Sequence, residues 1–223
     1  MIRKKAAILF SGGKDSCLAL FKSRENYDIK YLLNVNVVNK DSFMFHKPDL
    51  NLLRKQAEML EIKLIIKKSK GEENEELADL KELIKEVGKE VDVIVVGGIA
   101  SSYQGNRVKK ICEELDLEFY APLWDYKSEK IWKELLDNNF KVIITKIACE
   151  GLGKEWLEKE INKENFKILE ELSKKYKFRL DFEGGEAETA VLDMPGFKKD
   201  IKIKFDIDSE GEHRHSIRIR EIK

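Results

Sequence analysis

The most constraining feature of this chain is a short apolar run that leads directly into a loop rich in glycine and serine. The run covers Ala6–Phe10, the loop reads Ser11-Gly12-Gly13-Lys14-Asp15-Ser16, and a helical pattern follows. Glycines let the backbone N–H groups approach an anion, the lysine adds a positive charge, and the following helix presents its positive end. The hydroxyls of Ser11 and Ser16 can complete this cradle. The loop therefore predicts a nucleotide phosphate site, and the alternative is an ordinary strand-to-helix turn.

The loop differs from a Walker A motif in two ways. The upstream glycine of that motif is missing, and Asp15 stands where Ser or Thr follows the lysine. The order Ser11 to Ser16 instead resembles the signature of the ATP pyrophosphatase (PP-loop) superfamily. Members of that superfamily cleave ATP between the α and β phosphates and adenylate a substrate, so the resemblance implies AMP-forming chemistry.

The first half of the chain alternates apolar strands with amphipathic helices. Strands are expected at Ala6–Phe10, Tyr31–Val38, Leu64–Ile66 and Val91–Val96, with stripes of apolar residues at helical spacing between them. This alternation predicts a parallel sheet with helices on both faces and a ligand at the carboxyl ends of the strands. The resemblance adds that this is the PP-loop, or adenine nucleotide alpha hydrolase-like, α/β fold.

After Pro122 the pattern changes to a mixture of helices and alternating strands. A helix near Ser128–Leu136, a strand at Val142–Ile147, a long helix from about Lys163 and a terminal β-hairpin from Ile201 are expected. We therefore predict two domains, an ATP-binding domain over 1–121 and a smaller α+β substrate-binding domain over 122–223. The 42% hydrophobic content of the 223 residues is sufficient for such cores.

Charge, cysteine content and hydropathy limit the partners. Lys+Arg and Asp+Glu number 42 each, which disfavours a long nucleic-acid partner. The three cysteines form no Cys-x-x-Cys pair, and Cys17 and Cys112 fall on apolar helix stripes, which favours core positions. No apolar stretch reaches membrane-spanning length, and the apolar run near the N-terminus is too short for a signal peptide. We expect a cytoplasmic protein without a membrane partner.

Three further segments are richer in polar residues than packing explains. Ser42–His46 follows the second strand, where a loop contact is the plain alternative for the histidine. Gly97–Arg107 follows the fourth strand, where Arg107 can reach a phosphate and a helix cap by Ser101 or Ser102 is the alternative. Glu183–Thr189 places three carboxylates around a Gly-Gly turn, which a cation, a metal or solvent must separate.

Together these segments resemble the diphthine-ammonia ligase family over nearly the whole chain. The family order is the loop Ser11–Ser16, then Phe43-Met44-Phe45-His46, Ser102-Tyr103-Gln104 with Arg107, Ala121-Pro122-Leu123-Trp124, Glu183-Gly184-Gly185-Glu186 with Glu188-Thr189, and Asp193-Met194-Pro195. The sequence departs from the family at two positions. Phe182 stands where the family often has glycine, and Ala187 stands where it often has an aromatic residue.

The resemblance implies that ATP activates the carboxylate of diphthine on translation elongation factor 2 as an acyl adenylate, and that ammonium supplies the nitrogen that displaces AMP. Two alternatives remain, a tRNA-modifying adenylating enzyme of the same superfamily and a non-catalytic adenine-nucleotide-binding module. The expected cofactors are ATP and Mg²⁺, with Asp15 as the metal ligand. Expected catalytic residues are Lys14, Asp15, Glu186 and Glu188; expected ATP ligands are Ser11, Gly12, Gly13, Lys14, Asp15, Ser16, Gly97, Ser101 and Arg107; expected substrate ligands are His46, Tyr103, Gln104, Trp124, Glu183, Gly184, Gly185 and Thr189.

Overall fold

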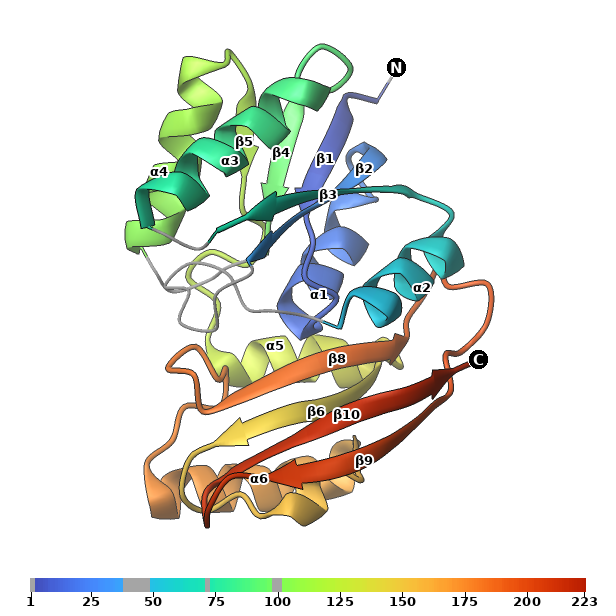
Figure 1. The fold of residues 1–223 in the computed structure, drawn as a ribbon, viewed down its shortest axis with the longest axis vertical. Coiled ribbons are helices and arrows are strands. Elements are labelled where there is room, and N and C mark those ends of the chain that lie inside the picture. The colour runs from blue at the N-terminus through green and yellow to red at the C-terminus, as the bar shows by residue number, and fades with distance from the viewer. Residues whose placement is uncertain (1–2, 38–48, 71–72, 98–101) are drawn as a thin grey trace. The chain divides into compact units, whose positions relative to one another are not determined.

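The chain folds as two compact units (Figure 1). The computed structural model describes residues 3–37, 49–70, 73–97 and 102–223. The first unit ends at Asp125, and the second comprises Gly12–Lys14 together with Tyr126–Lys223. Three residues of the glycine loop thus belong with the C-terminal part of the chain. The boundary after residue 121 and the roles of the two domains stay predictions.

The first unit is built on a five-stranded sheet. Its strands are β1 (Lys5–Leu9), β2 (Asp28–Val37), β3 (Lys63–Ser69), β4 (Val93–Val96) and β5 (Glu118–Tyr120). They lie in the order β3-β2-β1-β4-β5, and every neighbouring pair is parallel. The predicted parallel sheet is confirmed. The short strand β5 was not expected, because three residues are too few to show a period.

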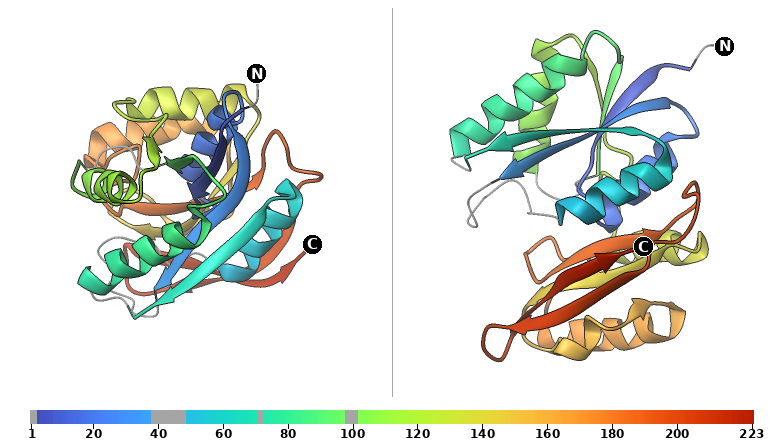
Figure 2. Two further views of the ribbon diagram at one scale, coloured as in Figure 1. Left: turned by 90° about the horizontal axis from the view of Figure 1, so that it is seen from above. Right: turned by 45° about the vertical axis from the view of Figure 1, so that its right-hand side comes forward.

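Helices cover both faces of this sheet, as predicted (Figures 1 and 2). They are α1 (Lys14–Ser23), α2 (Leu50–Leu60), α3 (Glu73–Val87) and α4 (Ser102–Glu114). On one face, Leu33 and Val35 of β2 share a buried cluster with Leu80 and Ile84 of α3 and with Cys112 of α4. Cys112 is therefore a core residue, and so is the fully buried Cys17 of α1. Removing this apolar surface from water is the main stabilisation of the unit.

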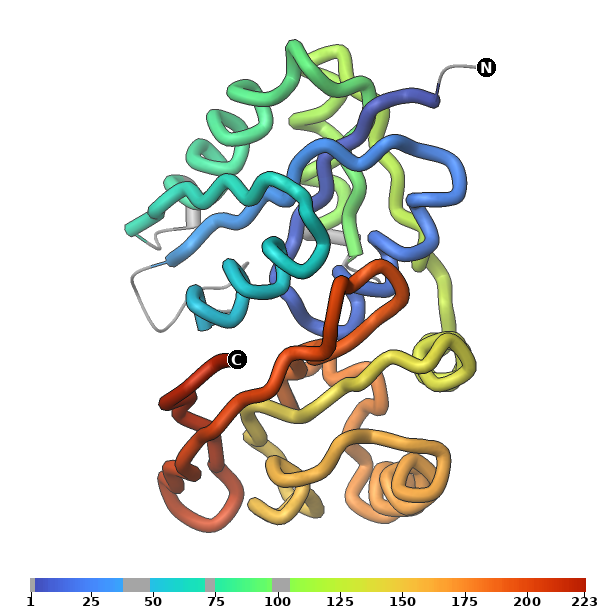
Figure 3. The backbone as a smooth tube through the Cα atoms, turned by 90° about the vertical axis from the view of Figure 1, so that its right-hand side faces the viewer, coloured from blue at the N-terminus to red at the C-terminus, as the bar shows by residue number. Residues whose placement is uncertain are grey.

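The second unit has an antiparallel sheet centred on β6 (Lys141–Ala148). Its other strands are β7 (Glu160–Ile161), β8 (Ala187–Asp193), β9 (Ile203–Ser209) and β10 (Arg214–Ile222), and its helices are α5 (Ser128–Asp137), the short 3₁₀ helix η1 (Lys154–Trp156) and α6 (Lys163–Tyr176). β6 pairs with β8 and also with β7 and β10. β9 and β10 form the predicted hairpin, which Figure 3 traces to the C-terminus.

Local sequence explains where the helices of the second unit begin and what they bury. α6 starts at a capping box, in which the Asn162 side chain accepts the N–H groups of Glu164 and Asn165. Trp132 of α5 is fully buried, and its indole N–H donates to the Leu180 carbonyl at 2.7 Å. Burying a tryptophan requires such a partner for its single donor.

In the described part of the chain, no helix is long and apolar enough to cross a lipid bilayer.

A glycine is required where β4 ends. A Cβ atom on Gly97 would lie 2.7 Å from Ser16 Cα and 2.8 Å from Ser16 N. Both are backbone atoms at the start of α1, so they cannot rotate away. The end of β4 and the helix after the glycine loop therefore approach each other more closely than a side chain allows.

We expect Gly97→Ala to lower the free energy of unfolding by about 1–3 kcal/mol, because overpacking forces the backbone to shift. Urea denaturation followed by circular dichroism measures this. Gly88→Ala is the matched control, since its Cβ would meet its nearest atom, the Ile84 carbonyl oxygen, at 3.2 Å and the loss should be smaller. Equal stability of wild type and Gly97→Ala would contradict the argument.

Candidate nucleotide and substrate site

The glycine loop joins the end of β1 to the start of α1. Gly12 has a φ of 75°, a left-handed conformation that glycine adopts without strain. The hydroxyls of Ser11 and Ser16 lie 3.2 Å apart, and the Ser11 N–H donates to Ser16 Oγ at 3.3 Å. The structure thus brings both predicted serines together at the N-terminus of α1. This arrangement of donors and helix end suits an anion.

An asparagine within β2 supports the start of this loop. The Asn34 side-chain amide donates to the Phe10 carbonyl at 2.9 Å, and the Phe10 N–H donates to the Leu33 carbonyl at 2.7 Å. Asn34 is buried. We did not predict this contact, although Asn34 and Asn36 are polar residues within an expected buried strand, which is a signal that could have found it.

Lys14 is held within the second unit. Its N–H donates to Thr189 Oγ1 at 3.1 Å, and its ammonium group donates to the Asp181 carbonyl at 2.6 Å. The side chain lies 5.7 Å from the centroid of the Phe182 ring, and the residue is 2% exposed. The Val191 N–H also donates to the Gly12 carbonyl at 3.0 Å. β8 and the residue before Phe182 thus hold the part of the glycine loop that was expected to bind phosphate.

The three carboxylates of the Glu183–Thr189 segment have different surroundings. Glu186 folds back over the turn, where its Oε1 accepts the Arg179 N–H at 3.1 Å and its carboxylate packs on Gly184. Glu188 pairs with Lys146 of β6 at 3.0 Å. Successive residues of a strand point to opposite faces, so Glu188 lies on the face of β8 opposite Thr189 and Lys14. The structure therefore separates Glu188 from the residues that hold the glycine loop.

Phe182 occupies a backbone position that favours glycine. Its φ is 61°, in the left-handed region. Its ring is buried, with centroids 6.1 Å from Trp132 and 6.3 Å from Phe178. Glycine would adopt this conformation without strain, whereas in this chain the burial of an aromatic ring offsets the cost of the conformation.

Asp181 was missed by sequence reasoning. Its carboxylate accepts two hydrogen bonds from the Arg179 guanidinium at 2.9 Å each, one from Ser128 Oγ at 2.9 Å and one from the Glu183 N–H at 3.0 Å. Burial acts to raise the pKa of Asp181, but these hydrogen bonds outweigh it and hold the pKa below its usual value. The only signal in the sequence was an arginine two residues before an aspartate beside the Gly-Gly turn.

The remaining predicted residues of the first unit lie on or near α4. Trp124 is 36% exposed, and its ring packs on Gly105, where no side chain would fit. Arg107 is half-buried in the second turn of α4. His46 and Ser101 lie outside the described residues, and of Tyr103 and Gln104 the structure describes only the backbone, in the first turn of α4.

The cysteines do not offer a thiolate at neutral pH. Burial raises the pKa of Cys112 to about 11, and burial together with the charge of Glu186 raises the pKa of Cys149 to about 11. Burial also raises the pKa of Cys17. Among the described residues, no group of three or more His, Cys, Asp or Glu side chains is placed to hold a metal ion.

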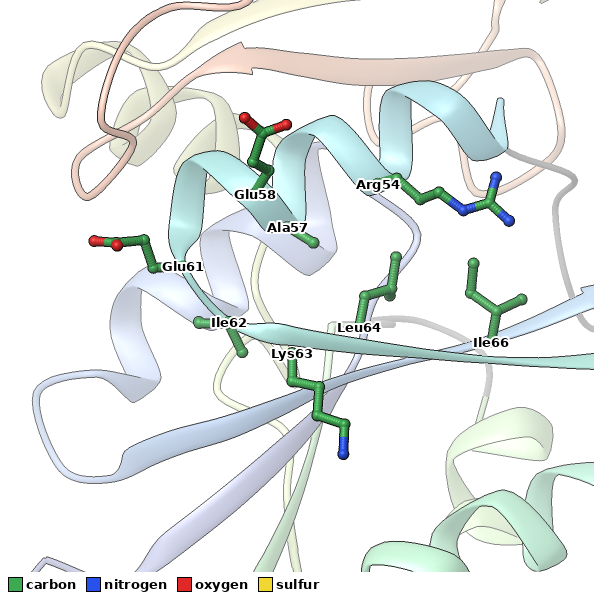
Figure 4. Close-up of a pocket in the computed structure, with 8 residues that line it drawn as sticks. All are labelled: Arg54, Ala57, Glu58, Glu61, Ile62, Lys63, Leu64 and Ile66. Atoms are coloured by element: carbon green, nitrogen blue, oxygen red, sulfur yellow. The ribbon is translucent and has the colours of Figure 1, made fainter.

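A groove on the surface of the first unit contains none of the predicted residues. It has a volume of about 460 Å³ and lies between α2 and the edge strand β3 (Figure 4). Its lining residues are Arg54, Ala57, Glu58, Glu61, Ile62, Lys63, Leu64 and Ile66. Charged side chains of both signs lie along it, and no feature of the described residues assigns it a ligand.

The fold defines an α/β protein with a glycine-rich loop between its first strand and its first helix. Comparison with known families assigns the chain more narrowly. Residues 4–119 match the diphthamide synthase N-terminal domain, and residues 127–222 match the diphthamide synthase C-terminal domain. The chain therefore belongs to the diphthamide synthase family, which confirms the resemblance inferred from its motifs.

Curated relatives carry a single name. The chain is 34% identical to a diphthine–ammonia ligase of Mus musculus and 35% identical to that of Homo sapiens, with alignments that cover 89% and 88% of this chain and 82% of each relative. The relative of Schizosaccharomyces pombe is 32% identical over 86% of this chain and 35% of its own length. A solved structure titled as a predicted subunit of tRNA methyltransferase from Methanocaldococcus jannaschii aligns with this chain at a TM-score of 0.43 and 17% identity. The alignment covers 88% of this chain and 99% of that one.

We expect the glycine variant at position 182 to be more stable than the alanine variant, by about 1 kcal/mol. Both remove the ring, but only alanine keeps the cost of a left-handed φ. Both should be less stable than wild type, because truncating a buried phenylalanine costs about 3–5 kcal/mol. Denaturant unfolding of Phe182→Gly and Phe182→Ala gives the comparison, and an alanine variant as stable as the glycine variant would refute the role of the backbone.

Proposed function

We propose that this chain is an AMP-forming ligase that converts diphthine to diphthamide on translation elongation factor 2. ATP activates the diphthine carboxylate as an acyl adenylate and releases pyrophosphate; ammonia then attacks the acyl carbon and displaces AMP. The observation that carries this proposal is the match to both domains of the diphthamide synthase family. A cytoplasmic location is expected for an enzyme that acts on a translation factor. No specific observation favours a tRNA substrate or a non-catalytic nucleotide module.

The glycine loop is the proposed site for the ATP phosphates. Backbone N–H groups of Gly12 and Gly13, the hydroxyls of Ser11 and Ser16, and the ammonium of Lys14 would face the pyrophosphate as its charge develops. The left-handed Gly12 and the paired hydroxyls fit an anion at this helix end. Gly97, Ser101 and Arg107 are proposed as further ATP ligands. Gly97 directly follows β4, which lies next to β1 in the sheet.

Magnesium is the expected metal, with Asp15 as its ligand. A hard carboxylate oxygen beside a polyphosphate site is the donor that Mg²⁺ prefers. The ion would neutralise phosphate charge when bound. Asp15 lies in the first turn of α1, directly after Lys14.

Residues of the Glu183–Thr189 segment, called the acidic turn below, are the proposed contacts for diphthine and ammonia. Glu183, Gly184, Gly185 and Thr189, with His46, Tyr103, Gln104 and Trp124, form the proposed substrate-binding set. A ring such as that of Trp124 suits the trimethylammonium group that the resemblance implies for diphthine.

Glu186 is the better candidate for the base that accepts a proton from ammonium. The sequence predicts both Glu186 and Glu188 as catalytic residues. Lys146 pairs with Glu188 on the opposite face of β8 from Lys14, whereas Glu186 lies in the turn that continues from Asp181. Free ammonia is the expected nitrogen source, because a glutamine-hydrolysing site needs a thiolate, and the raised pKa values of Cys112 and Cys149 disfavour one.

The proposed reaction is tested with purified protein, ATP, magnesium, ammonium and elongation factor 2 that carries diphthine. We expect AMP and pyrophosphate, and a mass change of the factor that equals acid to amide. Lys14→Ala should slow the reaction by about a hundredfold or more, the scale of one charged transition-state contact. Lys141→Ala is the control, because it also removes a lysine side chain, but one that pairs with Asp200 and is not part of the glycine loop. Formation of ADP and phosphate would refute the proposed chemistry.

The two glutamates are distinguished by their glutamine variants. Glu186→Gln should leave adenylate formation intact and slow amide formation by about a hundredfold or more, the scale of a lost general base. Raising the pH should partly restore the rate, because more of the ammonium is then deprotonated. Glu188→Gln should have a small effect. Separate assays of pyrophosphate release and amide formation measure both steps, and a Glu186→Gln variant with full amidation activity would remove Glu186 from the mechanism.

A further inference from the structure

Asp181 contacts both groups of residues that the proposed function requires. Its backbone carbonyl accepts the ammonium of Lys14 at 2.6 Å. Its carboxylate accepts the Glu183 N–H at 3.0 Å, at the first residue of the acidic turn. Lys14 and Glu183 are far apart in the sequence, and all three residues belong to the second unit. One residue therefore links the lysine of the glycine loop to the start of the acidic turn.

Three neighbours hold the carboxylate of Asp181, whose carbonyl accepts the Lys14 ammonium group. Arg179 and Ser128 fix the two carboxylate oxygens from the chain before the turn and from α5. A bidentate guanidinium bond restrains direction as well as distance. With the side chain held, the peptide after Asp181 has little freedom, and Phe182 follows in a left-handed conformation. The carbonyl oxygen that holds Lys14 belongs to this restrained peptide.

A neutral carbonyl is a suitable partner for a lysine that must bind phosphate. It orients the ammonium group without cancelling its positive charge, and the bond uses one of three donor hydrogens. The negative charge of Asp181 is directed instead to the guanidinium of Arg179. The hydrogen bond to the Asp181 carbonyl thus restrains the position of the Lys14 ammonium group without neutralising it.

We propose that Asp181 is a positioning residue that couples the acidic turn to Lys14: its side chain fixes the turn, and its carbonyl holds the lysine in place for the phosphates. The effect on adenylation rests on the proposed function. The restraint on Lys14 does not, and it can be measured without turnover.

The first experiment measures the reactivity of Lys14. The folded protein is treated with the N-hydroxysuccinimide ester of acetic acid, and acetylation of each lysine is followed by mass spectrometry. Asp181→Ala should raise the acetylation rate of Lys14 several-fold, because the carbonyl no longer holds it. Asp137→Ala is the matched control in the same unit: Asp137 pairs with Lys133 and Lys163, so those two lysines should respond and Lys14 should not.

The second experiment is a double-mutant cycle on the rate of pyrophosphate release. Asp181→Ala alone should slow adenylation about tenfold, mainly in kcat and with little change in the KM for ATP. In a Lys14→Ala background the same change should slow it less than about twofold, because coupled residues are not additive. Full additivity would show that Asp181 does not act through Lys14 and would overturn the proposal.

A second variant keeps the test decisive if Asp181→Ala does not fold. Asp181→Asn keeps an oxygen acceptor but loses the charge that faces Arg179, so both effects should appear in the same direction and be smaller. Arg179→Lys should resemble it. Unchanged Lys14 acetylation in folded Asp181→Asn and Arg179→Lys would overturn the restraint, whereas a wild type that forms no AMP would refute the proposed function and leave the acetylation result valid.

Discussion

The structure of the glycine loop depends on how a buried lysine is accommodated. Lys14 is almost completely inaccessible to solvent, and a buried ammonium group is costly unless it is hydrogen-bonded. The Asp181 carbonyl, the Phe182 ring and the Thr189 hydroxyl surround this residue. The Asp181 carbonyl supplies one acceptor for this ammonium group. Arg179 and Ser128 hold the Asp181 side chain, and Phe182 follows in a left-handed conformation.

The alternation of strand β8 distributes the polar residues of the family motif. Thr189 faces the backbone of Lys14, and Glu188 faces Lys146 on β6. Because neighbouring side chains of a strand point in opposite directions, adjacent polar residues of one strand cannot all face one site. Glu186 lies just before the strand, where its carboxylate accepts the Arg179 N–H and stabilises the turn. The motif therefore combines residues that hold the loop with residues that shape the strand.

Glycines in this chain serve two separate purposes. Gly12 and Gly185 adopt positive φ values, which turn the backbone sharply at the glycine loop and at the Gly184-Gly185 turn. Gly97 and Gly105 instead provide space, the first for the backbone of Ser16 and the second for the ring of Trp124. A sequence motif does not distinguish the two purposes, since both appear only as glycine. The consequence of substitution differs accordingly, backbone strain in one case and steric overlap in the other.

The parallel sheet, its flanking helices and the terminal hairpin were predictable from the sequence, because apolar periodicity reports directly which face of an element is buried. The family could also be inferred, from the order of motifs such as Ser11–Ser16 and Glu183–Glu186. Only the tertiary structure decided which motif residues meet: Thr189 with Lys14, Glu188 with Lys146, and Asp181 with Arg179, Ser128 and Lys14. Most of these contacts join residues distant in the sequence, and they depend on strand register and on one backbone carbonyl, which no side-chain pattern encodes.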